Sequence, residues 1–272
     1  MAVQITSLNY SGQTGEVTLY LPTGSTVTYT SATTINLGVK TMPFQYEAPD
    51  ITWEYGVFSI YFSATTKTCT VSEITPPDGS GNTYKTIKIG NQIWMSENLK
   101  TTKFQDGTLL NTTSVSNATW AAASGSTTKY WALVNSSNNN TARYGLLYNE
   151  FAITGSTTGS TASTNLCPSG WHIPTNDEFA TLNTFLDANT TTQLKLKSTT
   201  LWTSINGTNS SGFNGVPAGF RSSSGSFNSF NQVVYFWTTN FNTYWRLANF
   251  NTTFANGTFD SRYGLSVRCL KD

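Results

Sequence analysis

The feature that most constrains the fold is the segment NLCPSGWHIPTNDEF at residues 165–179. Pro168 and Gly170 mark a sharp turn, and Pro174 marks a second turn a few residues later. Trp171, a large apolar side chain, lies between the two turns. We therefore expect an ordered loop that buries Trp171 and then leads into a regular element.

That element is predicted to be a helix. Thr175 stands at the N-cap position with Glu178 three residues later, which is the pattern of a capping box. Apolar side chains then recur at helical spacing, at Phe179, Leu182, Phe185 and Leu186. One face of this helix must be covered by another part of the chain.

The segment GLSVRCL at residues 264–270 alternates and predicts a closing strand. We expect its apolar face, Leu265, Val267 and Cys269, to cover the helix, with Ser266, Arg268 and Leu270 on the other face. Cys269 would then lie where it can meet Cys167.

Three cysteines leave at least one unpaired. A bridge between Cys167 and Cys269 would close a loop of about 100 residues, which the chain-entropy model values at about 4.7 kcal/mol. In a reducing compartment the same residues would be buried thiols, and the sequence leaves both outcomes open. Cys69 is expected in a strand that faces a core.

The domain organisation follows from composition. Residues 1–75 contain short β-prone segments separated by Gly and Pro, which favours a small all-β sandwich or barrel. The sequence PPDGSGN at residues 76–82 has the composition of a linker. Residues 83–272 then form a second domain, and the overall class is α+β.

Charge and composition exclude several functions. The net charge is +1 with no run of Lys or Arg, so no nucleic-acid partner is expected. No stretch reaches the roughly 18 apolar residues needed to span a bilayer. His172 is the only histidine, so neither zinc-ligand spacing nor a Ser-His-Asp arrangement is present. We expect no metal, no cofactor and no enzymatic activity, and His172 is interpreted as structural.

Six ordered blocks resemble the Fibrobacter succinogenes major paralogous domain: residues 84–99, 144–148, 167–174, 212–214, 217–221 and 264–269. This resemblance implies a C-type-lectin-like fold with few helices and mixed or antiparallel sheets. The same scaffold carries variable ligand-binding faces in proteins diversified by retroelements, and it hosts many functions. The carboxylates with which sugar-binding C-type lectins hold calcium are missing around Trp237 and Asn240.

The segment from residue 212 onward reads as hairpins rich in Tyr, Asn and Arg, a mixture typical of adaptable recognition surfaces. The scaffold resembled holds its variable residues here. The predicted ligand-binding residues are Tyr235, Asn240, Asn242, Tyr244, Arg246, Asn249, Asn251, Asn256 and Arg262, with their side chains facing outward. The alternative is that the Asn residues only solvate the hairpins. Cys167, Cys269, Trp171, Trp237 and Trp245 are assigned structural roles.

Together these observations favour a phage virion surface protein, such as a head fibre, tail fibre or decoration protein. Residues 1–75 resemble small β domains of tailed-phage structural proteins, with a generic β module as the alternative. They would bind other virion proteins, while the second domain would bind a host glycan or protein. A homo-oligomer, with a trimer favoured, would gain from multivalency. The alternatives are a bacterial cell-surface or secreted adhesion protein and a purely structural virion component.

Overall fold

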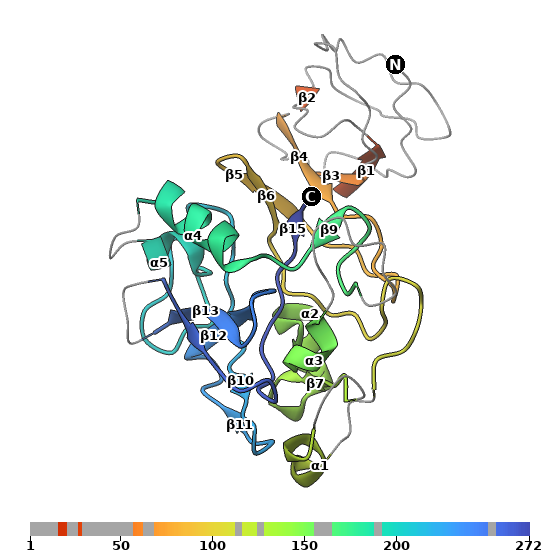
Figure 1. Cartoon of the computed structure of the whole chain (residues 1–272). Coiled ribbons are helices and arrows are strands. Elements are labelled where there is room, and N and C mark those ends of the chain that lie inside the picture. The colour runs from red at the N-terminus through yellow and green to blue at the C-terminus, as the bar shows by residue number, and fades with distance from the viewer. Residues whose placement is uncertain are drawn as a thin grey trace. The chain divides into compact units, whose positions relative to one another are not determined.

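The computed structural model describes residues 16–20, 27–28, 57–61, 68–111, 116–123, 128–154, 165–187, 192–249 and 254–272. The chain divides into two compact units, Met1–Pro76 and Pro77–Asp272. Figure 1 traces both units along the chain, and each is described by itself.

The described strands of the first unit are β1 (Glu16–Tyr20), β2 (Val27–Thr28), β3 (Val57–Tyr61) and β4 (Thr68–Ile74). They form one antiparallel sheet in the order β1-β3-β4-β2. Cys69 is a strand residue, as expected, and pairs with Val27. One of the β-prone segments from which strands are expected, FQYEA at residues 44–48, lies outside the described residues.

The second unit begins with a folded turn. Asp78 is buried, and its carboxylate accepts hydrogen bonds from the backbone N–H of Ser80 (2.8 Å) and of Asn82 (3.0 Å). The Tyr84 hydroxyl donates to the same carboxylate at 2.5 Å. Residues 78–82, expected to be part of a linker, are therefore anchored to the second unit, because the side chain of Asp78 satisfies the backbone of the turn.

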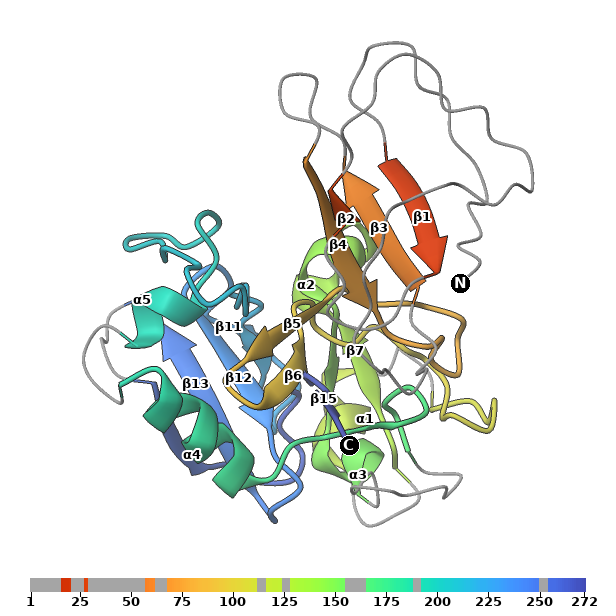
Figure 2. The ribbon, with the colours of Figure 1, turned by 90° about the horizontal axis from the view of Figure 1, so that it is seen from above.

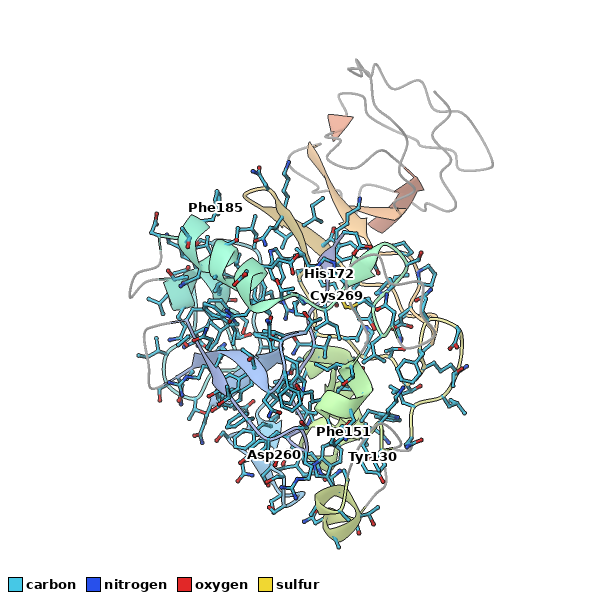
Figure 3. All side chains as sticks on the ribbon, in the orientation of Figure 1. Tyr130, Phe151, His172, Phe185, Asp260 and Cys269 are labelled. Carbon is cyan, nitrogen blue, oxygen red and sulfur yellow. A yellow bond between two sulfur atoms is a disulfide. The ribbon has the colours of Figure 1, made fainter. Side chains whose placement is uncertain are left out.

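A sheet with the order β5-β6-β15-β9 joins the start of this unit to its end. β5 (Thr86–Ile89) and β6 (Gln92–Met95) form a hairpin across a two-residue turn at Gly90 and Asn91. β15 (Leu270–Lys271) pairs with β6 and with β9 (Trp171–His172). Residues 165–179, which we term the organising segment, thus lie directly beside residues 264–270, the closing segment. Figure 3 labels His172 and Cys269, one from each segment, close to each other.

The remaining elements are short. The strands are β7 (Trp131–Leu133), β8 (Leu146–Tyr148), β10 (Phe220–Arg221), β11 (Phe227–Asn228), β12 (Val233–Trp237), β13 (Thr243–Ala248) and β14 (Ala255–Thr258). The helices are α1 (Asn117–Ala121), α2 (Thr141–Tyr144), α3 (Glu150–Ile153), α4 (Asn176–Phe185) and α5 (Thr192–Leu196), with 3-10 turns η2 (Val134–Ser136) and η3 (Asn138–Asn140). The unit is therefore α+β, with few helices and several small antiparallel sheets.

Helix α4 starts as predicted, because the Thr175 side chain and the Glu178 side chain form both hydrogen bonds of a capping box. Its partner was predicted wrongly. Phe179 packs against the rings of Trp94 (4.9 Å) and Trp245 (6.1 Å), so α4 covers β13 and β6. Figure 2 shows α4 running alongside β12 and β13.

The face of α4 is also narrower than predicted. Phe185 is 58 % exposed, and its ring lies against Gly90 in the turn between β5 and β6. A Cβ on Gly90 would stand 2.9 Å from that ring. The ring of Phe185 can occupy this exposed position because residue 90 has no Cβ.

The closing segment is buried on both faces, which corrects the alternating pattern expected for it. Leu265, Val267 and Cys269 belong to a core that also contains Trp171, whereas Leu270 lies in the α4 core. Its polar residues are buried because neighbouring oxygens satisfy them.

Arg268 is the clearest example, because its side chain is fully buried. It donates to the Asn98 side chain and to the carbonyl oxygens of Met95, Phe213 and Asn214. Burial lowers the pKa of Arg268 to about 9, and the charge of Glu97 acts in the opposite direction. This side chain ties the closing segment to two distant parts of the chain.

Cys167 and Cys269 form a disulfide with a Cα–Cα distance of 6.0 Å, which decides between the two outcomes that the sequence left open. Both residues are buried. The bridge holds the organising segment to the closing segment.

A candidate ligand-binding face

The sheet β12-β13-β14 has two faces with different neighbours. Opposite residues of antiparallel strands share a face, and successive residues alternate between faces. Phe236, Trp245 and Asn256 therefore point toward α4, while Tyr235 and Arg246 point the other way.

Six side chains on the second side form one surface, which we term the aromatic face: Phe220, Tyr235, Tyr244, Arg246, Phe259 and Tyr263. Phe259 and Tyr263 stack at 4.2 Å between ring centroids with an interplanar angle of 8°. The ring of Phe259 also meets Tyr244 (4.5 Å) and Tyr235 (5.0 Å). Phe220 completes the cluster with an edge-to-face contact to Tyr235 at 5.4 Å. Such pairs contribute about 0.5–1.5 kcal/mol each beyond the area that they bury.

Two glycines make this packing possible. Gly257 is opposite Tyr244 on β14, and a Cβ there would stand 2.5 Å from the Tyr244 hydroxyl oxygen. Gly219 has a φ of +69° and forms a parallel bridge to Val234, which places Phe220 beside β12. A residue with a positive φ has a left-handed backbone, which glycine adopts at little cost because it has no Cβ.

The two predicted tyrosines are more enclosed than expected. Tyr235 is 8 % exposed and Tyr244 is 9 % exposed, so the prediction that their rings face solvent is wrong. The loop carrying Phe259 and Tyr263 packs over them, and those two rings are the partly exposed ones. Burial raises the pKa of Tyr244, the charge of Tyr235 adds to this shift, and Arg246 opposes it.

Arg246 supplies the charge of the aromatic face. It lies opposite Tyr235 on β13 and is half-buried. Among the described residues, its guanidinium forms no hydrogen bond and no ion pair. A guanidinium with no carboxylate partner among the described residues can donate hydrogen bonds to an acidic or hydroxylated ligand.

Arg262, in contrast, is occupied by the protein. Its guanidinium binds both carboxylate oxygens of Asp260, at 2.8 and 2.9 Å, and donates to the carbonyl oxygen of Ala121. The Trp120 indole N–H donates to the carbonyl oxygen of Arg262 at 2.6 Å. Arg262 therefore holds α1 against the loop that carries the aromatic face.

Asn240 and Asn256 lie at the start of α4. The Asn240 side-chain oxygen accepts from the backbone N–H of Asn176 at 2.7 Å, and the Asn256 amide donates to the Asn176 side chain at 3.0 Å. The Trp245 indole N–H donates to the same Asn176 oxygen at 2.9 Å. The predicted site residues thus do not share one surface, and Asn176, which the sequence did not single out, connects these three.

Asn242 joins the hairpin tip to a buried acid. Its backbone N–H and the hydroxyl of Ser261 both donate to the carboxylate of Glu150, which is 5 % exposed. The Ser261 hydroxyl oxygen also lies 2.9 Å from the side-chain oxygen of Asn242. Figure 3 labels Asp260 near Phe151, at this end of the unit. Glu150 therefore fixes the loop that covers the aromatic face.

Two further predicted residues lie at the end of β13. Asn249 donates its backbone N–H to the carbonyl oxygen of Gln232 at 2.8 Å. Its side-chain oxygen is buried and has no hydrogen-bond partner among the described residues. Asn251 lies outside the described residues.

The residues assigned structural roles are buried. Trp171 is 2 % exposed, and Trp237 is fully buried with its indole N–H donating to the carbonyl oxygen of Tyr148 at 2.8 Å. Trp245 packs under α4 and binds Asn176.

His172 is buried between two carboxylates. One ring nitrogen lies 2.6 Å from Asp272 and the other lies 3.0 Å from Glu178. Burial is the largest influence and lowers the pKa of His172, but the hydrogen bonds and charges of the two acids together raise it above its ordinary value.

In the part of the chain that the structure describes, no three His, Cys, Asp or Glu side chains are grouped to hold a metal ion. No helix among the described residues has the length and apolar character required to cross a membrane.

The chain matches the Fibrobacter succinogenes major domain over residues 87–271, which is well over half of its length. The chain belongs to this family. The match begins within β5 and ends at β15, so this family domain contains α4, the disulfide and the aromatic face. No curated protein and no solved structure was found to match the chain.

Proposed function

We propose that this protein is a non-catalytic binding protein that displays a receptor- or glycan-binding face, built on a C-type-lectin-like variant of its family fold. The observation that carries the proposal is the aromatic face itself. A cluster of partly exposed rings lies on the same face of the sheet as Arg246, which forms no hydrogen bond or ion pair among the described residues.

The chemistry of this face suits a ligand with both apolar and polar parts. Partly exposed rings such as Phe259 and Tyr263 offer contact area at low entropic cost. The hydroxyls of Tyr235 and Tyr244 form no hydrogen bond among the described residues, and Arg246 adds a donor with a fixed charge. Sugar rings and amphipathic protein surfaces present the matching combination of C–H faces and oxygen acceptors.

The test is binding to a glycan array and to bacterial cells, measured with the full chain and with Tyr263→Ala and Arg246→Gln. Both changes remove groups from the rim of the face while leaving Tyr235 and Tyr244 in place. Thr258→Ala is the matched control, because Thr258 is exposed on β14 and lies on the face toward α4. We expect each face variant to weaken binding by about tenfold or more, and the control to bind normally.

Unchanged binding in variants that unfold at the normal temperature would contradict the proposed face. If no cell or glycan is bound at all, the result favours the alternative of a purely structural virion component, in which the aromatic face is a contact between subunits.

We further propose that the setting is a phage virion, where the first unit attaches to other structural proteins and the second unit faces the host. This proposal rests on the resemblance of residues 1–75 to small phage β domains. Antibody labelling of purified particles tests it directly. Label at regular positions on the particle surface is expected, whereas label on bacterial cells alone would favour an adhesion protein.

A further inference from the structure

A cleft of about 400 Å³ lies in the second unit, separate from the aromatic face. The side chains that give it its character are polar: Ser96, Glu97, Arg143, Thr199, Thr200 and Asn214. No residue of the aromatic face lines this cleft. Its volume is within the range of sites for small molecules, although its walls are more polar than those of most such sites.

The cleft contains two opposite charges that are not paired with each other. Among the described residues, no ion pair includes Glu97 or Arg143. Glu97 uses one carboxylate oxygen to accept the backbone N–H of Lys85 at 2.8 Å. Arg143 is exposed at the end of α2, and its side chain interacts with the hydroxyl of Tyr144 by charge and by a hydrogen bond. The charge of Glu97 also acts on the buried Arg268. Neither Glu97 nor Arg143 takes part in an ion pair among the described residues, so each can still contact a charged ligand.

The wall at residues 198–202 is held by its own hydrogen bonds. The Ser198 hydroxyl donates to the carbonyl oxygen of Thr200 at 2.7 Å and accepts from the Trp202 indole N–H at 3.1 Å. Between them, Leu201 lines the cleft with a φ of +83°, a left-handed conformation that costs energy for a residue with a Cβ. Backbone strain of this kind is concentrated at ligand-binding sites.

The floor is also fixed. Asn214 contributes its carbonyl oxygen to the buried guanidinium of Arg268, and its side-chain amide donates to the carbonyl oxygen of Ser96 at 3.5 Å. Floor and wall are therefore ordered before any ligand arrives, which reduces the entropic cost of binding.

We propose that this cleft binds a small zwitterion, with Glu97 contacting the cationic group, Arg143 contacting the anionic group, and the hydroxyls and amide of the walls solvating the rest. A ligand with a single charge would leave one of the two side chains uncompensated. A neutral polyol would use neither charge. The cleft is thus selective for a molecule that carries both.

The experiment is an NMR titration of the 15N-labelled full chain with L-alanine, followed at the amides of Glu97, Thr199, Thr200 and Asn214. Acetate and ethylammonium serve as probes with one charge each, and glycerol serves as the neutral probe. We expect alanine to cause saturable shifts at these amides, and each of the other probes to bind at least about tenfold more weakly.

Glu97→Gln and Arg143→Gln are each expected to weaken alanine binding by about tenfold or more. Gln at position 97 keeps an oxygen for the Lys85 N–H, so the fold is preserved. Asp106→Asn and Lys88→Gln remove the same charges elsewhere and should bind alanine normally. The proposal is overturned if alanine causes no saturable shift, if glycerol binds equally well, or if either cleft variant binds as the wild type does.

Discussion

The two faces of the β12-β13-β14 sheet both carry aromatic residues, but they are covered by different elements. On one face, Phe179 of α4 lies within 6.2 Å of Phe236 and 6.1 Å of Trp245, so a helix seals the rings. On the other face, Tyr235 and Tyr244 are covered by Phe220 of β10 and by a loop whose own rings stay partly exposed. An aromatic-rich strand therefore does not reveal a binding face by its composition. What covers each face decides whether the rings form a core or a surface.

The cores on the two sides of the sheet also differ in whether a covalent cross-link stabilises them. The core behind the aromatic face contains the Cys167–Cys269 disulfide, whereas the α4 core contains interlocked rings and no disulfide. The covalent link therefore lies in the core on the side of the sheet that a loop covers. Three predictions test this difference.

The largest effect is expected from removing the covalent link. The double change Cys167→Ala and Cys269→Ala opens a loop with a sequence separation of 102 residues. The chain-entropy model predicts a loss of about 4.7 kcal/mol in the free energy of unfolding. Urea denaturation followed by tryptophan fluorescence measures this in the second unit, because Trp53 is the one tryptophan of the first unit.

Cys69→Ala is the matched control, since Cys69 lies in β4 of the first unit and should leave the second transition unchanged. A loss below about 1 kcal/mol in the double variant would mean that packing, and not the bridge, holds the closing segment.

The second effect compares the two covers. Phe179→Ala should lower the free energy of unfolding by about 3–5 kcal/mol, because this fully buried ring meets four aromatic neighbours in the α4 core. Phe259→Ala removes the same side chain from the aromatic face, where the ring is half-buried, and should cost about 1–2 kcal/mol. Denaturation of both variants gives the ratio. Equal losses would show that both faces are sealed cores.

The local features of this fold could be predicted from the sequence, because the interacting residues are neighbours along the chain. The Thr175 and Glu178 capping box and the two-residue turn between β5 and β6 are of this kind. The partner of α4 could not be predicted in the same way. Several segments offer apolar faces, and the choice among them depends on packing across long separations.

The candidate site shows the same limit. Period-2 alternation correctly relates Tyr244 to Arg246, but it cannot place Asn240 or Asn256, whose roles depend on the distant Asn176. The burial of a cation is a second feature that the sequence pattern did not predict. A polar residue in an alternating strand normally predicts a solvent-facing position, yet Arg268 is enclosed because carbonyl oxygens from two distant segments, at Met95 and at Phe213 and Asn214, converge on it.

The smallest effect concerns how the α4 cover is attached, and it depends on pH. The pKa of His172 is raised in the folded state, so the stability that it contributes is complete below its unfolded value of about 6.5 and is lost as pH rises through the folded value. The pKa of Glu178 is lowered: burial alone would raise it, but the hydrogen bond to His172 and those from Thr175 outweigh burial. Its contribution is present above its unfolded value and is lost as pH falls through the folded one.

The hydrogen bond between protonated His172 of β9 and Glu178 of α4 should therefore contribute most to stability near pH 6. His172→Gln should cost about 1.5–3 kcal/mol there, the usual range for hydrogen bonds to charged groups, and less at pH 9, because the stability that comes from a raised pKa is lost as pH rises. The measurement is the difference in unfolding free energy between wild type and variant at the two pH values. Asp272→Asn is the companion variant, because it removes one of the two acids that raise the histidine pKa and should shift the pH-dependent loss to lower pH. A difference that is the same at both pH values would mean that His172 is neutral when folded, and that the α4 cover is attached by packing alone.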